Sequence, residues 1–247
     1  MFDLAISIVT YNSDLSSLIK LVDQINNEKK LKIKIIIIDN NSDASYFLKL
    51  LNLNCNVISS GKNQGYGSSH NLANSLLNHS KYYLVLNPDI FLEKDTLLNC
   101  FNFMEMHDDY SLVTPVLKDD SNNYYKIENR NFSFFEILKR RFGKDNTLLN
   151  SKDFNIQNKI IDTNFISGAY MFFRRDIFNS IDGFDERFFM YFEDVDICKR
   201  IIEFGKIGIL DYSYAYHKRS RASYKSFKMM FIHLISLLKF NFKNYKN

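Results

Sequence analysis

The chain has 247 residues, of which 46% are hydrophobic and 15% aromatic, so it can bury a substantial core and disorder is excluded as its main state. Its formal net charge of +4 conceals a partition, because residues 217–247 hold eight basic residues and no acid (+8), which leaves −4 for the rest. Three widely spaced cysteines argue against a disulfide framework and a zinc site, and the lack of a run of about 18 apolar residues or of a cleavable leader predicts a cytosolic protein.

The first half of the chain alternates two kinds of hydrophobic pattern. β-Branched or aromatic runs, which are typical of strands, occupy residues 4–10, 33–39, 56–59 and 82–87. Between them, helical patterns occupy residues 15–25, 45–53 and 68–77. Strands that alternate with helices predict a mixed, mainly parallel α/β sheet with helices on both faces.

The second half is less regular. Its strand candidates are residues 112–117, 160–166, 169–174 and 206–216, and its helical patterns occupy residues 95–106 and 193–204. Residues 118–159 are polar, rich in Asn and Lys, and interrupted by Phe132, Phe134 and Phe135. A long, weakly patterned segment inside a compact domain is more often a lid or a binding loop than filler, so we expect this insert to be functional.

The C-terminal segment 224–242 is predicted to be an amphipathic basic helix. Its apolar stripe consists of Phe227, Met230, Phe231, Leu234, Ile235 and Leu238. Two interpretations are open: a final helix docked on the core, or attachment to an anionic membrane surface, to which each nearby Lys or Arg contributes about 1 kcal/mol. Because the basic residues flank an apolar stripe, lipid is favoured over nucleic acid as the partner.

Polar residues follow four consecutive strands, at the edge where parallel α/β sheets bind their ligands. They are Thr10, Tyr11 and Asn12; Asp39, Asn40, Asn41 and Ser42; the glycine-rich segment 61–67; and Asn87, Pro88 and Asp89. Asp39 or Ser42 could cap the next helix, or the carboxylate could accept the N3 proton of a uracil or thymine ring. The glycine-rich segment is either an ordinary turn or, through its position, part of a ligand site. Asp89 is either part of a turn or a ligand for Mg²⁺ or Mn²⁺, which bind few protein carboxylates and otherwise take phosphates and water.

The densest cluster of acids lies in FFMYFEDVDICKR, residues 188–200. Glu193, Asp194 and Asp196 follow an aromatic run and begin a helical pattern. The helix dipole alone favours acids there, by about 0.3–1 kcal/mol each. The helix dipole does not explain the aromatic run that precedes these acids. The low dielectric of that run would raise the pKa of a carboxylate towards values suited to a general base. His217, which follows the last strand candidate, is either structural or part of a metal or diphosphate site.

Together these segments resemble the family 2 glycosyltransferases with the GT-A fold, and within them the bacterial rhamnosyltransferase-like group. The similarity covers roughly residues 6–223. It rests on SIVTYNSD (7–14), IIIIDNNSD (35–43), GKNQGYGSSHN (61–71), LVLNPDI (84–90), SGAYMFFRRDIF (167–178), GFDERFFMYFEDVDICKR (183–200) and His217. The resemblance implies a Rossmann-like nucleotide-binding domain over residues 1–223, with a donor-binding half before about residue 117 and an acceptor-side half from about residue 118, followed by the basic helix 224–247.

The resemblance also implies roles for individual residues. The nucleoside and donor would be held by Thr10, Tyr11, Asn12, Asp39, Asn63, Gly65, Asn71 and Asn87. Asp89 matches the last Asp of the family's D-x-D motif and, with His217, would hold Mg²⁺ or Mn²⁺. Asn87 stands where many members have the first Asp, a common variant in the rhamnosyl group. Asp194 matches the catalytic base, with Glu193 beside it.

The activity implied is an inverting, metal-dependent sugar transfer in which Asp194 takes the proton of an acceptor hydroxyl. The expected donor is dTDP-L-rhamnose, with UDP-galactose, UDP-N-acetylglucosamine and UDP-galactofuranose as alternatives. The expected acceptor is a lipid-linked glycan of bacterial O-antigen or capsule synthesis, which the insert around residues 132–142 would face. We expect a cytoplasmic protein peripheral to the inner face of the plasma membrane, with no nucleic-acid partner and with homodimerisation left open.

Two competing functions use the same features differently. A sugar nucleotidyltransferase would share the architecture and the metal, but it usually carries a glycine-rich basic loop after the first strand, where this chain has residues 10–13, Thr-Tyr-Asn-Ser. A non-catalytic membrane-peripheral module that binds nucleotide sugars would use the basic tail and tolerate Asp89→Ala.

Overall fold

The β-branched and aromatic runs of the first half form the parallel part of one mixed sheet. The computed structural model describes residues 2–77, 79–125, 148–149, 159–217 and 227–243. The parallel strands, in the spatial order β3-β2-β1-β4, are β1 (Phe2–Thr10), β2 (Ile33–Asp39), β3 (Asn56–Ser59) and β4 (Ser80–Leu86). Thr10 pairs with Asp39 and Asp39 pairs with Ser59, so three strand ends meet at one edge.

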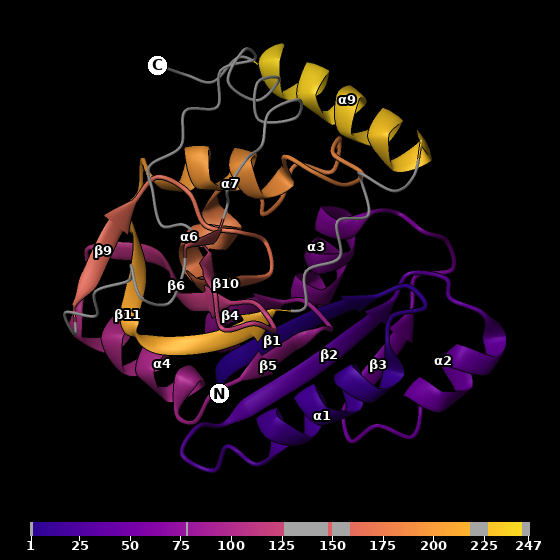
Figure 1. Cartoon of the computed structure of the whole chain (residues 1–247), viewed down its shortest axis with the longest axis horizontal. Coiled ribbons are helices and arrows are strands. Elements are labelled where there is room, and N and C mark those ends of the chain that lie inside the picture. Colours follow the sequence, from indigo (N-terminus) through magenta and orange to yellow (C-terminus); the bar gives the residue numbers. More distant parts are fainter. Residues whose placement is uncertain (1, 78, 126–147, 150–158, 218–226, 244–247) are drawn as a thin grey trace.

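Helices cover both faces of the sheet (Figure 1). Those that share one core are α1 (Leu15–Asn26), α2 (Ala44–Leu50) and α4 (Thr96–Met106). Those that share the other are α3 (Tyr66–Leu76), α6 (Arg175–Ser180) and α7 (Glu193–Ile201). Successive side chains of a strand point to opposite faces, so β1 contributes Leu4, Ile6 and Ile8 to the first core and Ala5 and Val9 to the second.

The second half adds antiparallel strands to the same sheet. β10 (Tyr170–Arg174) lies antiparallel between β4 and β6 (Tyr110–Lys118), and β11 (Lys206–His217) runs parallel to β6. The short strands are β5 (Ile90–Leu92) and β9 (Ile160–Thr163), both antiparallel to β11, and the pair β7 (Tyr124–Tyr125) and β8 (Leu148–Leu149). The predicted mixed α/β sheet flanked by helices is confirmed.

Several boundaries differ from those predicted. The helix predicted over 193–204 ends at Ile201, and the strand predicted over 160–166 ends at Thr163. The sequence pattern does not predict β5 or α6, because elements of three and six residues are too short to show a period. The aromatic residues of the insert, Phe132, Phe134 and Phe135, lie outside the described residues, so its predicted role stays a prediction.

The C-terminal helix α9 (Phe227–Asn241) packs over α7 and the loop before it, away from the sheet (Figure 1). Leu237 and Phe240 are buried against Phe188, Phe192 and Val195. The predicted apolar stripe lies on another face of the helix and includes Phe227, Phe231, Leu234 and Leu238, which are 87%, 64%, 40% and 49% exposed. The helix therefore docks on the domain and also presents apolar side chains outwards. Within the described ranges, no helix has the length and hydrophobicity needed to cross a membrane.

Candidate active site

Asp39 ends β2 with its side chain almost completely buried, at 1% exposed. Its carboxylate accepts the backbone N–H of Ser42 at 3.1 Å. The N-cap residue of α2 is Asp43, so neither Asp39 nor Ser42 caps that helix. The capping interpretation is therefore wrong. The role of Asp39 as acceptor for the N3 proton of a pyrimidine stays a prediction.

The residues at the end of β1 are tied to the neighbouring loop and helix. The N–H of Asn12 donates to Ser42 Oγ at 2.8 Å, and Thr10 Oγ1 lies 2.8 Å from Tyr46 Oη on α2. Tyr11 keeps 56% of its surface exposed between them. Asn12 and Thr10 thus stabilise the loop, whereas the ring of Tyr11 is available to a ligand.

Asn40 organises the glycine-rich segment 61–67. Only 4% of Asn40 is exposed, and its Nδ2 donates to Asn63 Oδ1 at 3.1 Å and to the carbonyl of Gly65 at 3.0 Å. Its Oδ1 accepts the hydroxyl of Ser69 on α3 at 3.0 Å. The sequence places Asn40 among polar residues at a strand end, but nothing local distinguishes it from its neighbours as the residue that holds this segment.

Glycine at position 65 allows the glycine-rich segment to contact the aromatic run that precedes Asp194. Gly65 has a φ of 94° and a ψ of 177°, a conformation that is nearly restricted to glycine. A Cβ at this position would lie 2.3 Å from the carbonyl oxygen of Phe189. The N–H of Tyr66 donates to the same carbonyl at 2.9 Å. The glycine-rich segment is therefore in backbone contact with the chain that leads to Asp194.

Tyr66 connects the two acidic parts of the site. Its hydroxyl lies 2.9 Å from Asn87 Oδ1 and 2.7 Å from the carbonyl of Gly168. Asn87 Nδ2 lies 3.2 Å from His217 Nε2, and the N–H of Gly168 donates to Asp194 Oδ2 at 3.2 Å. Burial and nearby carboxylates raise the pKa of Tyr66 well above its usual value, so its hydroxyl keeps the proton that it donates. The sequence analysis did not assign Tyr66 to the site.

Asp89 and His217 form the part of the site that could hold a cation. His217 Nε2 lies 3.4 Å from Asp89 Oδ1, an oxygen that is buried without a hydrogen-bond donor among the described residues. Such an oxygen is costly unless a cation completes its environment, so the pair fits Mg²⁺ or Mn²⁺. The described part of the chain has no cluster of three or more His, Cys, Asp or Glu suited to a metal. Ions that bind mainly substrate phosphates and water do not need one.

Glu193 and Asp194 begin α7 and differ in exposure. Glu193 is 6% exposed, and its Oε2 has no hydrogen-bond partner among the described residues. Burial, and then the charge of Asp194, raise the pKa of Glu193 well above its usual value, which favours the neutral form of this carboxyl. Asp194 is only partly buried and its Oδ2 is oriented by the N–H of Gly168. The geometry therefore favours Asp194 over Glu193 as a proton acceptor.

The side chain of Asn71 hydrogen-bonds to Phe184 and to none of the groups described above. Its Nδ2 donates to the carbonyl of Phe184 at 2.8 Å, and its Oδ1 accepts the N–H of Phe184 at 2.9 Å. It also lines a cleft between α3 and residues 178–186, whose lining includes neither Asp39 nor Asp89. Its predicted place along a nucleotide pocket stays a prediction.

Several known proteins are similar to this chain. The sequence model of the family described as Glycosyl transferase family 2 matches residues 5–182. Rhamnosyltransferase WbbL of Escherichia coli K12 is 28% identical over 151 residues, which are 58% of this chain and 56% of that protein. The low-salt glycan biosynthesis hexosyltransferase Agl10 of Haloferax volcanii is 26% identical over 221 residues, 85% of this chain and 66% of that protein. The chain thus spans less than two thirds of the length of these relatives.

Solved structures share the fold at low sequence identity. GalNAc-T7 with UDP, GalNAc and Mn²⁺ superposes with a TM-score of 0.66 at 13% identity, over 89% of this chain and 43% of that one. The mannosyltransferase PcManGT of Pyrobaculum calidifontis, in complex with GDP-Man and Mn²⁺, gives a TM-score of 0.65 at 13% identity, over 99% and 65% of the two chains. S. aureus TarS 1–349 gives 0.62 at 15% identity, over 96% and 65%. The predicted GT-A fold is confirmed.

Proposed function

The chain belongs to glycosyl transferase family 2, and on this premise we propose that it is a metal-dependent transferase that inverts the configuration of the sugar it transfers. The proposed donor is dTDP-L-rhamnose, from which L-rhamnose is transferred. The proposed acceptor is a lipid-linked glycan of O-antigen or capsule synthesis. The observation that carries the proposal is the bridge made by Tyr66 between partly exposed Asp194 and the loop that bears Asp89. The choice of L-rhamnose is supported by WbbL and by a Mycobacterium tuberculosis N-acetylglucosaminyl-diphospho-decaprenol L-rhamnosyltransferase, which is 48% identical over 46 residues, 19% of this chain and 14% of that one. UDP-galactose, UDP-N-acetylglucosamine and UDP-galactofuranose are the alternative donors.

Asp194 is the base in the proposed reaction. Its carboxylate takes the proton of the acceptor hydroxyl while the hydroxyl oxygen bonds to the anomeric carbon on the face opposite the diphosphate. The bond from that carbon to the diphosphate oxygen breaks, the electron pair leaves with the diphosphate, and the configuration inverts in one step. The N–H of Gly168 orients Asp194 at 3.2 Å, and the raised pKa of Glu193 disfavours a second negative charge beside it.

The other strand ends serve the donor in this proposal. Asp39 accepts the N3 proton of the pyrimidine, which uracil and thymine share, and the exposed ring of Tyr11 stacks on the base. Asp89 and His217 would hold Mg²⁺ or Mn²⁺, which when bound neutralises the negative charge of the departing diphosphate.

A panel of nucleotide sugars, each with Mn²⁺ or Mg²⁺, tests the proposed donor. We expect dTDP-L-rhamnose to raise the melting temperature most and to be hydrolysed slowly without an acceptor, because a ligand that binds only the folded state stabilises it. A larger rise in melting temperature with a UDP-sugar would identify that sugar as the donor instead. If no donor raises the melting temperature or is hydrolysed, the transferase proposal is refuted.

Replacing Asp89 by Ala should abolish the metal-dependent part of donor binding. A ligand at 100 times its Kd stabilises the folded state by about 2.7 kcal/mol, so the melting-temperature rise with donor and Mn²⁺ should fall to that seen with donor and EDTA. The apo protein should lose little stability, because no described residue donates a hydrogen bond to Asp89 Oδ1 and the substitution removes only its 3.4 Å pairing with His217 Nε2. Asp120→Asn, which changes an exposed loop acid, is the control. A metal-dependent rise that survives in Asp89→Ala would locate the cation elsewhere.

The exposed stripe of α9 is the proposed contact with an anionic membrane surface, where a lipid-linked acceptor would be presented. Phe231 and Leu234 are 64% and 40% exposed, and burying such side chains fully contributes about 1.5–3 kcal/mol each. Replacing both by Ser should therefore weaken binding to vesicles that contain phosphatidylglycerol by at least about tenfold in a sedimentation assay. Leu48→Ser, at a leucine of α2 that is 62% exposed, is the matched control. Equal sedimentation of the double variant and the wild type would contradict attachment through this stripe.

A further inference from the structure

Two residues with a strained backbone lead into α7. Tyr191 and Phe192 have φ values of 70° and 67°, in the left-handed region that bulky L-residues rarely adopt. Phe192 is the N-cap residue and makes no side-chain capping hydrogen bond. Such conformations persist only where the surroundings hold them. The position of Asp194, in the first turn of this helix, therefore depends on contacts from elsewhere.

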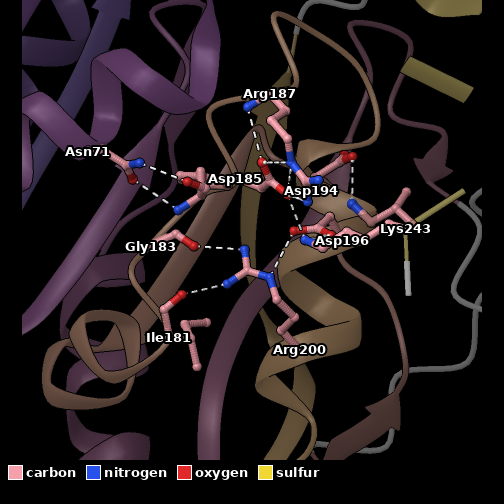
Figure 2. A network of polar contacts seen from close by, with 11 residues as sticks. Asn71, Ile181, Gly183, Asp185, Arg187, Asp194, Asp196, Arg200 and Lys243 are labelled. Carbon is pink, nitrogen blue, oxygen red and sulfur yellow. Dashed lines mark hydrogen bonds and ion pairs between the residues drawn. The ribbon is translucent and has the colours of Figure 1, made fainter. Parts of the chain in front are cut away.

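The carboxylate of Asp196, in the same turn, forms ion pairs with two basic side chains. Its side chain is 0% exposed, its Oδ2 accepts Arg200 Nε at 2.8 Å and its Oδ1 accepts Lys243 Nζ at 2.5 Å. Figure 2 shows Arg200 and Lys243 approaching this carboxylate from different parts of the chain. A buried charge is costly unless it is paired and hydrogen-bonded, so both partners contribute to holding Asp196 in place.

The same cations hold the loop before α7. Arg200 donates to the carbonyls of Ile181 and Gly183, each at 2.7 Å (Figure 2). Lys243 donates to Asp185 Oδ2 at 2.7 Å. Burial alone would raise the pKa of Asp185, but its hydrogen bonds, including the one from Lys243, outweigh burial and lower it. Asp185 is therefore ionised at neutral pH and pairs with Lys243 as a charged group.

Helix α9 makes two further contacts to this loop. Ser236 Oγ donates to the carbonyl of Met190 at 2.8 Å, and Lys239 Nζ donates to the carbonyl of Arg187 at 2.5 Å. Lys243 lies just beyond the end of α9, so residues 236–243, the end of α9 and the residues after it, bind the loop at three points. The face of α9 that packs on the domain, which we call its inner face, thus holds the loop that leads into α7 in place.

We propose that Lys243, acting through Asp196, is a positioning residue that fixes the first turn of α7 and with it the carboxylate of Asp194. The inference rests on the proposed function, in which Asp194 is the base. It gives the inner face of α9 a part in the chemistry that is separate from the exposed stripe. Lys243 lies beyond residues 5–182, the stretch that the family model matches.

Three variants test the proposal in the full chain. Lys243→Met removes the charge and keeps most of the aliphatic stem, so kcat should fall on the order of 10-fold to 100-fold while the donor KM stays unchanged. Lys243→Arg keeps the charge and should restore most of the lost kcat. Lys20→Met, which removes an exposed lysine of α1, is the charge-matched control and should behave as the wild type.

Hydrogen exchange of the backbone amides of residues 189–197 gives a readout that does not depend on activity. At a temperature where every variant is folded, exchange should be faster there in Lys243→Met and unchanged in β1 and α3. Wild-type kcat, or unchanged exchange over 189–197, overturns the proposal, and so does faster exchange throughout the chain with a parallel loss of donor binding. If the wild type transfers no sugar from any donor, the proposed function fails. The exchange result alone then decides whether Lys243 secures α7.

Discussion

Replacing Asp194 by Asn is expected to abolish sugar transfer and to leave donor binding intact. Asn keeps the shape of the side chain and can still accept the N–H of Gly168, but its amide cannot take the proton of an acceptor hydroxyl. A positioned base contributes about 10²- to 10⁴-fold to the rate, so kcat should fall by about 10³-fold. The substitution leaves Asp39 and Asp89 unchanged, so the melting-temperature rise caused by donor and metal should remain.

Initial rates of nucleoside diphosphate release, together with thermal shifts by the donor, measure the two quantities separately. Glu203→Gln changes an exposed acid just beyond α7 and should have near-normal rates. Glu193→Gln distinguishes the neighbouring acids. Because burial and the charge of Asp194 raise the pKa of Glu193 and so favour its neutral form, which Gln mimics, the kcat of Glu193→Gln should fall far less than that of Asp194→Asn. Near-normal turnover of Asp194→Asn, with a large loss in Glu193→Gln, would assign the base to Glu193.

The parallel half of the sheet could be predicted from the sequence because local hydrophobicity alone defines it. The four isoleucines 35–38 are buried on both faces of β2, which has the predicted bounds, Ile33–Asp39. The polar residues that follow such runs must share one edge, because parallel strands end on the same side of a sheet. The pairing of Thr10 with Asp39 is a direct result. Fold class and the location of the candidate site therefore follow from short-range patterns.

The contacts that assemble the site could not be predicted, because they join residues that are far apart in the sequence. Tyr66 Oη contacts Asn87 and Gly168, which are 21 and 102 positions away, whereas its place between two glycines indicates only a turn. The helical pattern of α9 likewise predicts an apolar stripe, but it does not reveal that Leu237 and Phe240 form the docked face. Which of two apolar faces is buried depends on the shape of the partner surface.

Replacing Gly65 by Ala is expected to force the glycine-rich segment away from the chain that leads into α7. The new Cβ would lie 2.3 Å from the carbonyl oxygen of Phe189, and a φ of 94° is unfavourable for any L-residue. The backbone fixes the position of this Cβ and the atom that it meets is a backbone oxygen, so no side-chain rotation relieves the contact. The N–H of Tyr66 would lose its bond to the same carbonyl or the segment before α7 would shift. We expect a loss of about 3 kcal/mol in the free energy of unfolding, which corresponds to a fall of roughly 6–12 °C in melting temperature.

Gly61→Ala is the matched control for this substitution. Gly61 also has a left-handed φ, of 72°, but no atom of the described residues lies within 4 Å of a Cβ built there, so Ala costs only the backbone conformation, about 1–2 kcal/mol. The difference in melting temperature between the two variants therefore measures the contact with Phe189. Because that contact joins the proposed donor side to the chain before Asp194, Gly65→Ala should lower kcat as well as stability. Equal melting temperatures would mean that the glycine-rich segment and Phe189 do not meet in solution, and the single site that Tyr66 bridges would then divide into two separate parts.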